Sequence, residues 1–212
     1  MPHDSAGHTP IDMPDDPDAR IIRALKALLI GRGFFSADDV RRKIEELQSP
    51  APARGAALVA AAWSDPAFRA HLLADGKVAA AERGVPVLEA GLIVVENTPS
   101  LHNLITCTLC SCYPRSLLGQ PPPWYTSKAY RARSVRDPRG VLAELGWTPP
   151  RGIAIRVHDS TADMRYLVLP RRPDGTEGWP EGDLARLVTR DSMIGVAPAL
   201  SPSAVGRDPS GI

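Results

Sequence analysis

The sequence predicts an α+β fold in which a helical N-terminal arm precedes an α+β domain. Apolar residues recur at helical spacing through the first ~85 residues. After Gly84, short apolar or alternating runs typical of strands appear, and helical segments separate them. We find no internal repeat in the chain. The predicted divisions are a disordered leader (1–17), a helical arm (18–85), an α/β domain (86–197) and a flexible tail (198–212).

The predicted arm contains four helical segments, which follow a leader rich in proline and acidic residues. The second segment begins at Ser36, where Asp39 three positions later resembles a capping box. An alanine-rich segment occupies 53–63, and Asp65 with Pro66 resembles the cap and first turn of the fourth. The apolar stripes of the first, second and fourth segments are Ile21, Ile22, Leu25, Leu28 and Leu29; Val40, Ile44 and Leu47; and Phe68, Leu72 and Leu73.

The second domain alternates between strand and helix patterns, with Gly146 and Pro170 at the ends of two of them. The predicted strands are 92–95, 153–157, 165–169 and 193–196, and the predicted helices are 135–145 and 181–189.

Composition and charge are those of an ordinary globular chain. Of the 212 residues, 43% are hydrophobic and 23% are charged. A net charge of +1 leaves no electrostatic argument for binding nucleic acid or an anionic membrane. The N-terminus lacks the basic and apolar regions of a secretory signal, and no stretch approaches the ~20 apolar residues that span a bilayer. We therefore expect a cytoplasmic protein.

The three cysteines of the chain, Cys107, Cys110 and Cys112, all lie within six residues. An odd number of cysteines without an export signal argues against a disulfide framework. A strand would place Cys107 on the face opposite the other two, and a regular helix would spread the three around its axis. A tight loop around an ion would bring them together, and soft thiolates suit a transition metal. The spacing therefore favours a metal site.

The identity of the metal stays open on the residues alone. Zinc is the most common metal of such sites, but it requires a fourth ligand, for which His102 and His158 are candidates. A redox-sensing group of thiols or a cysteine-rich loop without a ligand are further alternatives. The backbone nitrogens of Ser111 and Cys112 lie between two sulfurs, and if deprotonated they would complete a planar set of two nitrogens and two sulfurs. Cys107 would then be the axial ligand, and the open sixth position would suit trivalent cobalt or iron acting as a Lewis acid.

The cysteine loop resembles the metal loop of nitrile hydratase α subunits, a family that includes the related metal subunit of thiocyanate hydrolase. Thr108 matches the cobalt type, since the iron type usually has serine there. Motifs on both sides of the loop extend the resemblance over roughly residues 20–197. These motifs are VVENTP (94–99), HNL (102–104), LG (118–119), PP (121–122), WY (124–125), YRAR (130–133), VRDPR (135–139), MRYLVLP (164–170), GTEGW (175–179) and TRDSMIGV (189–196).

The resemblance implies an extended helical arm, a layered α/β domain that binds the metal, and hydration of a nitrile to the primary amide. The metal would be one low-spin Co(III) per subunit, with iron as the less favoured alternative. Its ligands would be the sulfurs of Cys107, Cys110 and Cys112 and the backbone nitrogens of Ser111 and Cys112. Cys110 would be oxidised to a sulfinic acid and Cys112 to a sulfenic acid, whose oxygen would act as nucleophile or base.

The resemblance also implies partners. The active site would form against a β-type subunit, or two separate chains of this type, whose arginines hydrogen-bond the oxidised cysteines. A metal-loading activator protein is a further expected partner. Metal-bound thiolates are readily oxidised, and arginines are well matched to the resulting anionic oxygens.

Arg115 departs from the nitrile hydratase pattern, in which tryptophan usually follows Tyr-Pro. Thiocyanate hydrolases are similar to this chain in having arginine there, so Arg115 is a candidate for contact with an anionic or polar substrate. A surface or interface arginine is the alternative. The candidate catalytic residues are therefore Cys112, Ser111 and Arg115, where the Ser111 hydroxyl would contact substrate or the sulfur oxygens. Thiocyanate hydrolysis is the alternative function, and a structural zinc protein is a third.

Other polar residues have both structural and functional interpretations. Four arginines near a predicted helix start indicate either contacts around the metal loop and a subunit interface or a solvated face. Arg165 has the same two interpretations, His102 is expected to be structural, and Trp124 and Tyr125 are expected to pack. The four arginines are Arg131, Arg133, Arg136 and Arg139.

Overall fold

The computed structural model describes residues 17–40, 43 and 52–206. The contacts between residues divide the chain into two units, Met1–Glu46 and Leu47–Ile212. Three parts of the predictions lie outside the described residues: the leader except Pro17, half of the helix from Ser36 to Leu47, and the last six residues of the tail.

The described part of the first unit contains helix α1 (Pro17–Gly31), which confirms the first predicted helix. Most of its large apolar side chains are exposed, with 64% of Ile21 and 65% of Ile22 accessible to solvent. The predicted capping box is also present: the Ser36 backbone N–H donates to Asp39 Oδ2 (2.8 Å) and the Asp39 N–H donates to Ser36 Oγ (3.0 Å). These reciprocal bonds satisfy backbone donors that the following helix leaves unpaired.

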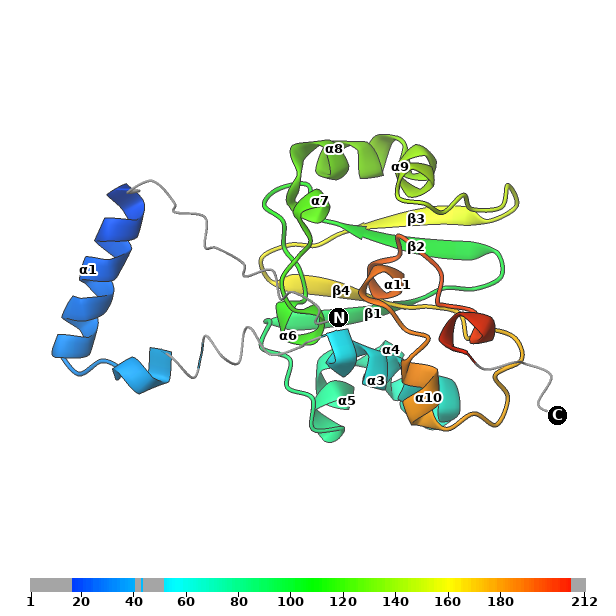
Figure 1. The fold of residues 1–212 in the computed structure, drawn as a ribbon, viewed down its shortest axis with the longest axis horizontal. Helices are drawn as coiled ribbons and strands as arrows, with labels where there is room; N and C mark the ends of the chain where they lie inside the picture. Colours follow the sequence, from blue (N-terminus) through cyan, green and yellow to red (C-terminus); the bar gives the residue numbers. More distant parts are fainter. Residues whose placement is uncertain (1–16, 41–42, 44–51, 207–212) are drawn as a thin grey trace, which may run out of the picture. The chain divides into compact units, whose positions relative to one another are not determined.

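The second unit contains two parallel pairs of strands in its described part. Strand β1 (Gly91–Glu96) pairs with β4 (Met164–Leu169), and β2 (Leu101–Thr106) pairs with β3 (Ala154–Asp159). Parallel strands are joined by crossover connections, and the helices of these connections cover both faces of the sheet. Figure 1 shows the strand pairs between two groups of helices, with α8 and α9 beside β2 and β3, and α4 and α5 beside β1.

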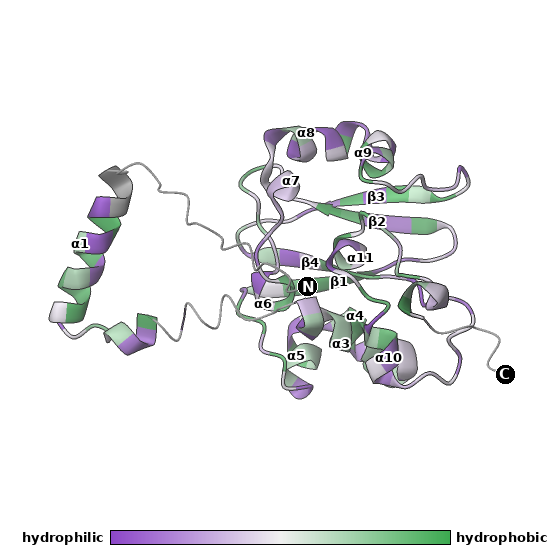
Figure 2. Ribbon diagram, in the orientation of Figure 1, coloured by the Kyte–Doolittle hydropathy of each residue, from purple (hydrophilic) through white to green (hydrophobic). Residues whose placement is uncertain are grey.

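The helices of this unit are mostly short. They are α3 (Pro52–Ser64), α4 (Pro66–Ala74), α5 (Gly76–Glu82), α6 (Arg115–Leu118), α7 (Pro123–Thr126), α8 (Lys128–Arg136), α9 (Pro138–Glu144), α10 (Glu181–Ala185) and α11 (Arg190–Ile194), followed by the 3₁₀ helix η1 (Pro202–Val205). Figure 2 shows an apolar β1 and a largely hydrophilic α8. None of the helices in the described ranges is both long and apolar enough to cross a membrane.

The core joins helices from the predicted arm to the strands. Leu58, Leu72 and Ala79 of α3, α4 and α5 are fully buried in one cluster with Leu104 and Leu167. The sequence pattern predicts these three helices as part of an arm ending at residue 85, whereas they share the core of the second unit. Their small alanine side chains allow close packing of helices against the strands.

The α+β class and the predicted strands at 92–95, 153–157 and 165–169 are confirmed as β1, β3 and β4. Strand β2 was not predicted, and the predicted strand at 193–196 is wrong. That segment ends helix α11, which begins with a capping box between Thr189 and Ser192 and closes at Gly195 with φ of 83°. An apolar run of four residues does not distinguish a strand from a buried helix.

The two predicted helices of this unit are shorter than expected. The helix at 135–145 is interrupted at Asp137, which ends α8 and caps α9 by accepting a bond from the Gly140 N–H (2.9 Å). The helix at 181–189 ends at Ala185. Part of the predicted tail is packed, because Pro202 in η1 is buried.

Candidate metal centre

The cysteine loop begins where β2 ends. Thr106 is the last residue of β2, and Cys107 follows it directly, buried beneath the loop. The Sγ atom of Cys110 lies 3.7 Å from that of Cys107 and 3.1 Å from that of Cys112. All three Sγ atoms lie within 4.8 Å of one another. The loop therefore gathers three soft donors around one point, which suits a transition-metal ion.

Ser111 gives the loop its turn. Its φ is 82°, and it is the only non-glycine residue with positive φ in the part of the chain that the structure describes. This conformation costs an L-residue ~1–2 kcal/mol, and such strain is concentrated at functional sites. It turns backbone N–H groups inward: the nitrogens of Cys110 and Ser111 lie 3.3 Å and 3.2 Å from Cys107 Sγ.

These N–H groups change the ionisation of the thiols. Burial raises the pKa of Cys107, but backbone N–H groups of Cys110, Cys112 and Leu109 and the Cys110 thiol lower it to about 7. Burial raises the pKa of Cys112 to about 12, together with the Cys110 thiol and the charge of Cys107, while Arg165 opposes the rise. Cys107 is therefore the first of the two to become the thiolate that binds metals.

Three elements hold the loop from outside. Asp159, at the end of β3, accepts bonds from Thr108 N (2.8 Å) and Thr108 Oγ1 (2.6 Å). The hydroxyl of Tyr125 in α7 donates to the Cys112 carbonyl (2.8 Å), and Arg131 Nη1 in α8 donates to the Leu109 carbonyl (3.0 Å). Asp159 was not among the residues predicted to belong to the site. Its position at the end of a predicted strand was the available signal.

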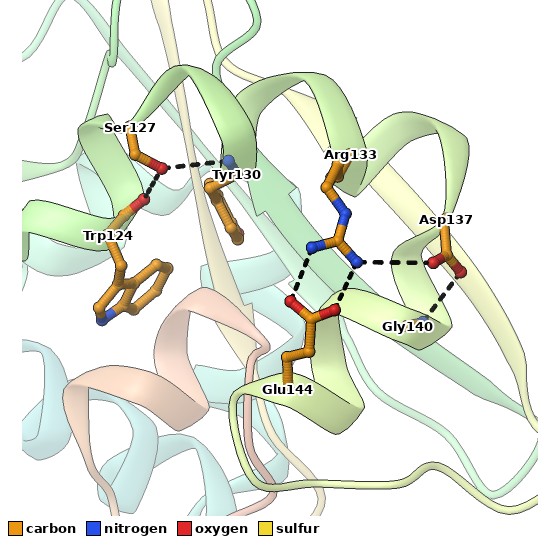
Figure 3. A network of polar contacts seen from close by, with 7 residues as sticks. All are labelled: Trp124, Ser127, Tyr130, Arg133, Asp137, Gly140 and Glu144. Atoms are coloured by element: carbon orange, nitrogen blue, oxygen red, sulfur yellow. Dashed lines mark hydrogen bonds and ion pairs between the residues drawn. The ribbon is translucent and has the colours of Figure 1, made fainter.

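Helix α8 also fixes the strand that leads into the loop. The Tyr130 hydroxyl donates to the Ile105 carbonyl (2.6 Å), and Ser134 Oγ donates to Thr106 Oγ1 (2.9 Å). Figure 3 shows how α8 is itself held. Ser127 Oγ accepts from the Tyr130 N–H at its start (3.1 Å), and two Arg133 nitrogens each lie 2.6 Å from the Glu144 carboxylate of α9.

The outer face of the loop is open. Leu109 is 86% exposed, Cys110 is exposed, and Ser111 is half-buried. Arg115 lies three residues beyond Cys112 as the first residue of α6. Its side chain is exposed and has no hydrogen-bond or ion-pair partner among the described residues.

The two histidines considered as further ligands have other partners. His102 Nε2 lies 2.7 Å from the Gly195 carbonyl, and His158 Nε2 lies 2.9 Å from Asn103 Oδ1. Within the described ranges, the group of potential metal ligands at the loop consists of the three cysteines, with no histidine or carboxylate. A fourth zinc ligand is therefore not supplied there.

The remaining predicted residues have mainly structural contacts. Arg139 Nη1 donates to the Pro149 carbonyl (3.2 Å), and Arg165 Nη1 donates to the Ala162 carbonyl (3.0 Å). The Trp124 ring packs edge-on against Tyr130, with ring centres 5.0 Å apart.

A pocket of about 390 Å³ lies away from the cysteines, at the start of β2. His102 and Trp147 form part of its wall, together with Arg171 and Arg172, and none of its lining residues is a cysteine. The chemistry of the thiols therefore belongs to the open loop and not to this pocket.

Comparisons with known proteins agree on one family. Residues 16–197 match the family described as nitrile hydratase, alpha chain. The chain is 49% identical over 184 residues to the low-molecular weight cobalt-containing nitrile hydratase subunit alpha of Rhodococcus rhodochrous, covering 86% of this chain and 89% of that protein. It is 45% identical over 186 residues to thiocyanate hydrolase subunit gamma of Thiobacillus thioparus, covering 82% and 76%. A solved double mutant of the Fe-type nitrile hydratase from Comamonas testosteroni Ni1 superposes with a TM-score of 0.78 at 44% identity, covering 88% and 93%.

Proposed function

We propose, since the chain belongs to the nitrile hydratase α-chain family, that it is the metal-carrying α subunit of a cobalt nitrile hydratase. Such an enzyme hydrates a nitrile to the primary amide. The observation that carries the proposal is the loop in which three cysteine sulfurs lie within 4.8 Å of one another. Relatives named as cobalt-containing support cobalt, and the Fe-type relative leaves iron as the less favoured metal.

The donor set of the loop fits a trivalent ion. The proposed ligands of one low-spin Co(III) are the sulfurs of Cys107, Cys110 and Cys112 and the backbone nitrogens of Ser111 and Cys112. The inward nitrogen of Ser111, 3.2 Å from Cys107 Sγ, supports this assignment. The backbone N–H of Cys112 also contributes to the lowered pKa of Cys107. When bound, the ion would supply a Lewis-acid centre.

The cysteines have different proposed roles. Cys107 would hold the ion through its thiolate. Cys110 would carry a sulfinic acid and Cys112 a sulfenic acid, whose oxygen would act as nucleophile or base. The Ser111 hydroxyl, which lies between two ligands, contacts substrate or the sulfur oxygens. Tyr125, through the Cys112 carbonyl, and Asp159, through Thr108, keep these groups in place.

The open face of the loop requires a partner. The 86% exposure of Leu109 and the exposed Cys110 support a β-type subunit, or two chains of this type, that covers the loop and supplies arginines to the oxidised sulfurs. Covering this face would exclude water from the site, which strengthens polar interactions with substrate. An activator protein for metal loading and a cytoplasmic location complete the proposal.

Thiocyanate hydrolysis is the second candidate function, and Arg115 is the observation that favours it. An exposed guanidinium without a partner in the described chain, three residues beyond Cys112, suits an anionic substrate better than an apolar nitrile. The identity to a thiocyanate hydrolase subunit supports the same alternative.

The test is to produce the chain with its partner subunits, measure metal content, and determine the masses of peptides carrying the cysteines. We expect cobalt, two added oxygen atoms on Cys110 and one on Cys112. Assays with thiocyanate and with several nitriles then distinguish the two reactions. Zinc with unmodified thiols, or no turnover of any of these substrates, would contradict the proposal.

A further inference from the structure

The segment before β1 carries a carboxylate that reaches the first turn of α6. Glu89 Oε1 accepts a hydrogen bond from the Ser116 backbone N–H (3.0 Å), and Glu89 Oε2 accepts one from the Ser116 hydroxyl. Ser116 is only 5% exposed, and Glu89 is half-buried. Because Ser116 directly follows Arg115, these bonds fix the chain next to the arginine that replaces the usual tryptophan of the nitrile hydratase pattern.

Helix α6 depends on this contact more than a longer helix would. It has four residues, too few to be stable by themselves. Its N-cap residue, Pro114, has no side chain that caps the helix. Glu89, 27 positions before Ser116, supplies the missing acceptor for a backbone donor of the first turn.

Both sides of the contact are themselves held. Lys77 Nζ in α5 donates to the Glu89 carbonyl (2.7 Å), which fixes the backbone that carries the carboxylate. Leu117 and Leu118 of α6 are buried at 0% and 1% exposure, which anchors the opposite face of the helix. The carboxylate therefore connects two parts of the fold that have little freedom to move.

Arg115 combines a fixed backbone with a free side chain. Its N–H donates to the Tyr113 carbonyl (2.8 Å), and its carbonyl accepts from the Gly119 N–H (2.9 Å). Its guanidinium has no partner among the described residues. The position of the guanidinium is consequently determined by the first turn of α6, the part that Glu89 caps.

We propose that Glu89 is a positioning residue for Arg115, which sets how this cation meets an anionic or strongly polar substrate above the cysteine loop. The inference rests on the second candidate function, thiocyanate hydrolysis, in which Arg115 meets the anionic substrate. Without the carboxylate, the first turn of α6 loses its acceptor and Arg115 samples more positions. An anion then loses more binding than a neutral nitrile, because only the anion depends on charge complementarity.

The experiment compares Glu89→Ala, Glu89→Gln and Ser116→Ala in the assembled, metal-loaded enzyme. Each is assayed for kcat and KM with thiocyanate and with acrylonitrile at low and high salt. Thiocyanate is also tested as an inhibitor of acrylonitrile hydration, and its affinity is measured by calorimetry. We expect Glu89→Ala to weaken thiocyanate binding about threefold to tenfold, as for the loss of one or two hydrogen bonds, with a smaller effect on acrylonitrile.

The other two variants separate the hydrogen bonds between Glu89 and Ser116 from the negative charge of Glu89. Glu89→Gln keeps an acceptor for the Ser116 N–H, and Ser116→Ala keeps that N–H but removes the hydroxyl, so both should give smaller losses in the same direction. The matched control is Asp75→Ala, which removes the carboxylate that caps α5 by accepting from Val78 N (3.1 Å). It should lower the thermal midpoint without changing the ratio of the kcat/KM values for the two substrates.

A double-mutant cycle with Arg115→Ala identifies the route of the effect. In that background, Glu89→Ala should no longer change the preference between thiocyanate and acrylonitrile. Two results would overturn this inference while leaving the proposed function standing, provided that the wild type is active. One is an unchanged preference between thiocyanate and acrylonitrile in Glu89→Ala, and the other is additive effects of the two mutations in the cycle. If Glu89→Ala does not assemble, Glu89→Gln and Ser116→Ala decide by the same criterion. A wild type that neither turns over nor binds these substrates would overturn the proposed function and the inference together.

Discussion

Polar residues lie at both ends of β2, but they are buried and hydrogen-bonded to one another at its start and open to solvent in the loop after its end. At its start, buried Asn97, His102 and Asn103 satisfy one another: Asn97 Oδ1 accepts from Asn103 N (2.7 Å), and His102 lies between Asn97 Nδ2 and the Gly195 carbonyl. At its end, Ser111 is strained and Cys110 is exposed. A closed set of hydrogen bonds indicates a structural role, whereas strained backbone, converging donors and an open face indicate a site.

The largest expected effect is at the closed end, at Gly195. A Cβ there would lie 1.9 Å from the Asn103 carbonyl oxygen, and φ is +83°. Gly195→Ala should therefore lower the free energy of unfolding by roughly 2–5 kcal/mol, from strain and steric overlap together. Gly84→Ala is the matched control, because its φ is +70° with nothing within 4 Å of the new Cβ. Equal thermal midpoints for the two variants would contradict the description of the closed end.

A substitution at the open end should weaken metal binding more than it lowers the stability of the fold. Asp159→Ala removes both bonds to Thr108 while changing an exposed residue. We expect metal retention or activity to fall about 10- to 100-fold, as for other residues that orient ligands. Metal content after dialysis against a chelator and the thermal midpoint of the metal-free chain measure the two effects. Asp163→Ala, an exposed change in the same β3–β4 connection, should leave metal retention unchanged. Equal losses of metal in the two variants would show that Asp159 does not orient the cysteine loop for metal binding.

Tyr125 and Tyr130 offer a matched pair of hydroxyl deletions. Tyr125→Phe removes the bond to the Cys112 carbonyl, and Tyr130→Phe removes the bond to the Ile105 carbonyl in β2. Each should lower the free energy of unfolding by about 0.5–1.5 kcal/mol. Turnover per bound metal should fall only in Tyr125→Phe, since only that bond reaches a ligand residue. If turnover per bound metal falls equally in both variants, the bond to the Cys112 carbonyl has no effect on the site beyond that of the bond to β2.

The smallest effect concerns pH at the closed end. Burial lowers the pKa of His102 below its ordinary value of 6.5, and the hydrogen bond with Gly195 partly opposes this. The unfolded chain therefore binds a proton at His102 before the folded chain does, so stability is full above pH 6.5 and falls as the pH drops below it. His102→Gln should flatten this dependence between about pH 7 and pH 5, by at most about 1.4 kcal/mol per pH unit. Parallel curves for the two proteins would contradict a neutral, buried His102.

The sequence predicted the loop better than the strand that carries it. Cys107, Cys110 and Cys112 are informative because three thiols so closely spaced meet only in a loop, and the motifs around them identified the family. Strand β2 was missed because polar His102 and Asn103 interrupt its apolar pattern. Both are buried, and some of their hydrogen-bond partners, Gly195 and His158, are distant in sequence.

The supports of the loop were less predictable for the same reason. Asp159 and Glu89 contact residues 51 and 27 positions away, and such contacts leave no local periodicity. The local capping box at Ser36 and Asp39, by contrast, was predicted and is present.

We propose that the cysteine loop holds cobalt through both sulfur and backbone nitrogen. X-ray absorption spectroscopy at the cobalt edge of the assembled enzyme tests it most directly. We expect low-spin Co(III) with three sulfur donors and two nitrogen donors, the latter assigned to Ser111 and Cys112. A spectrum without nitrogen donors, or an enzyme that is active with zinc in this loop, would contradict it.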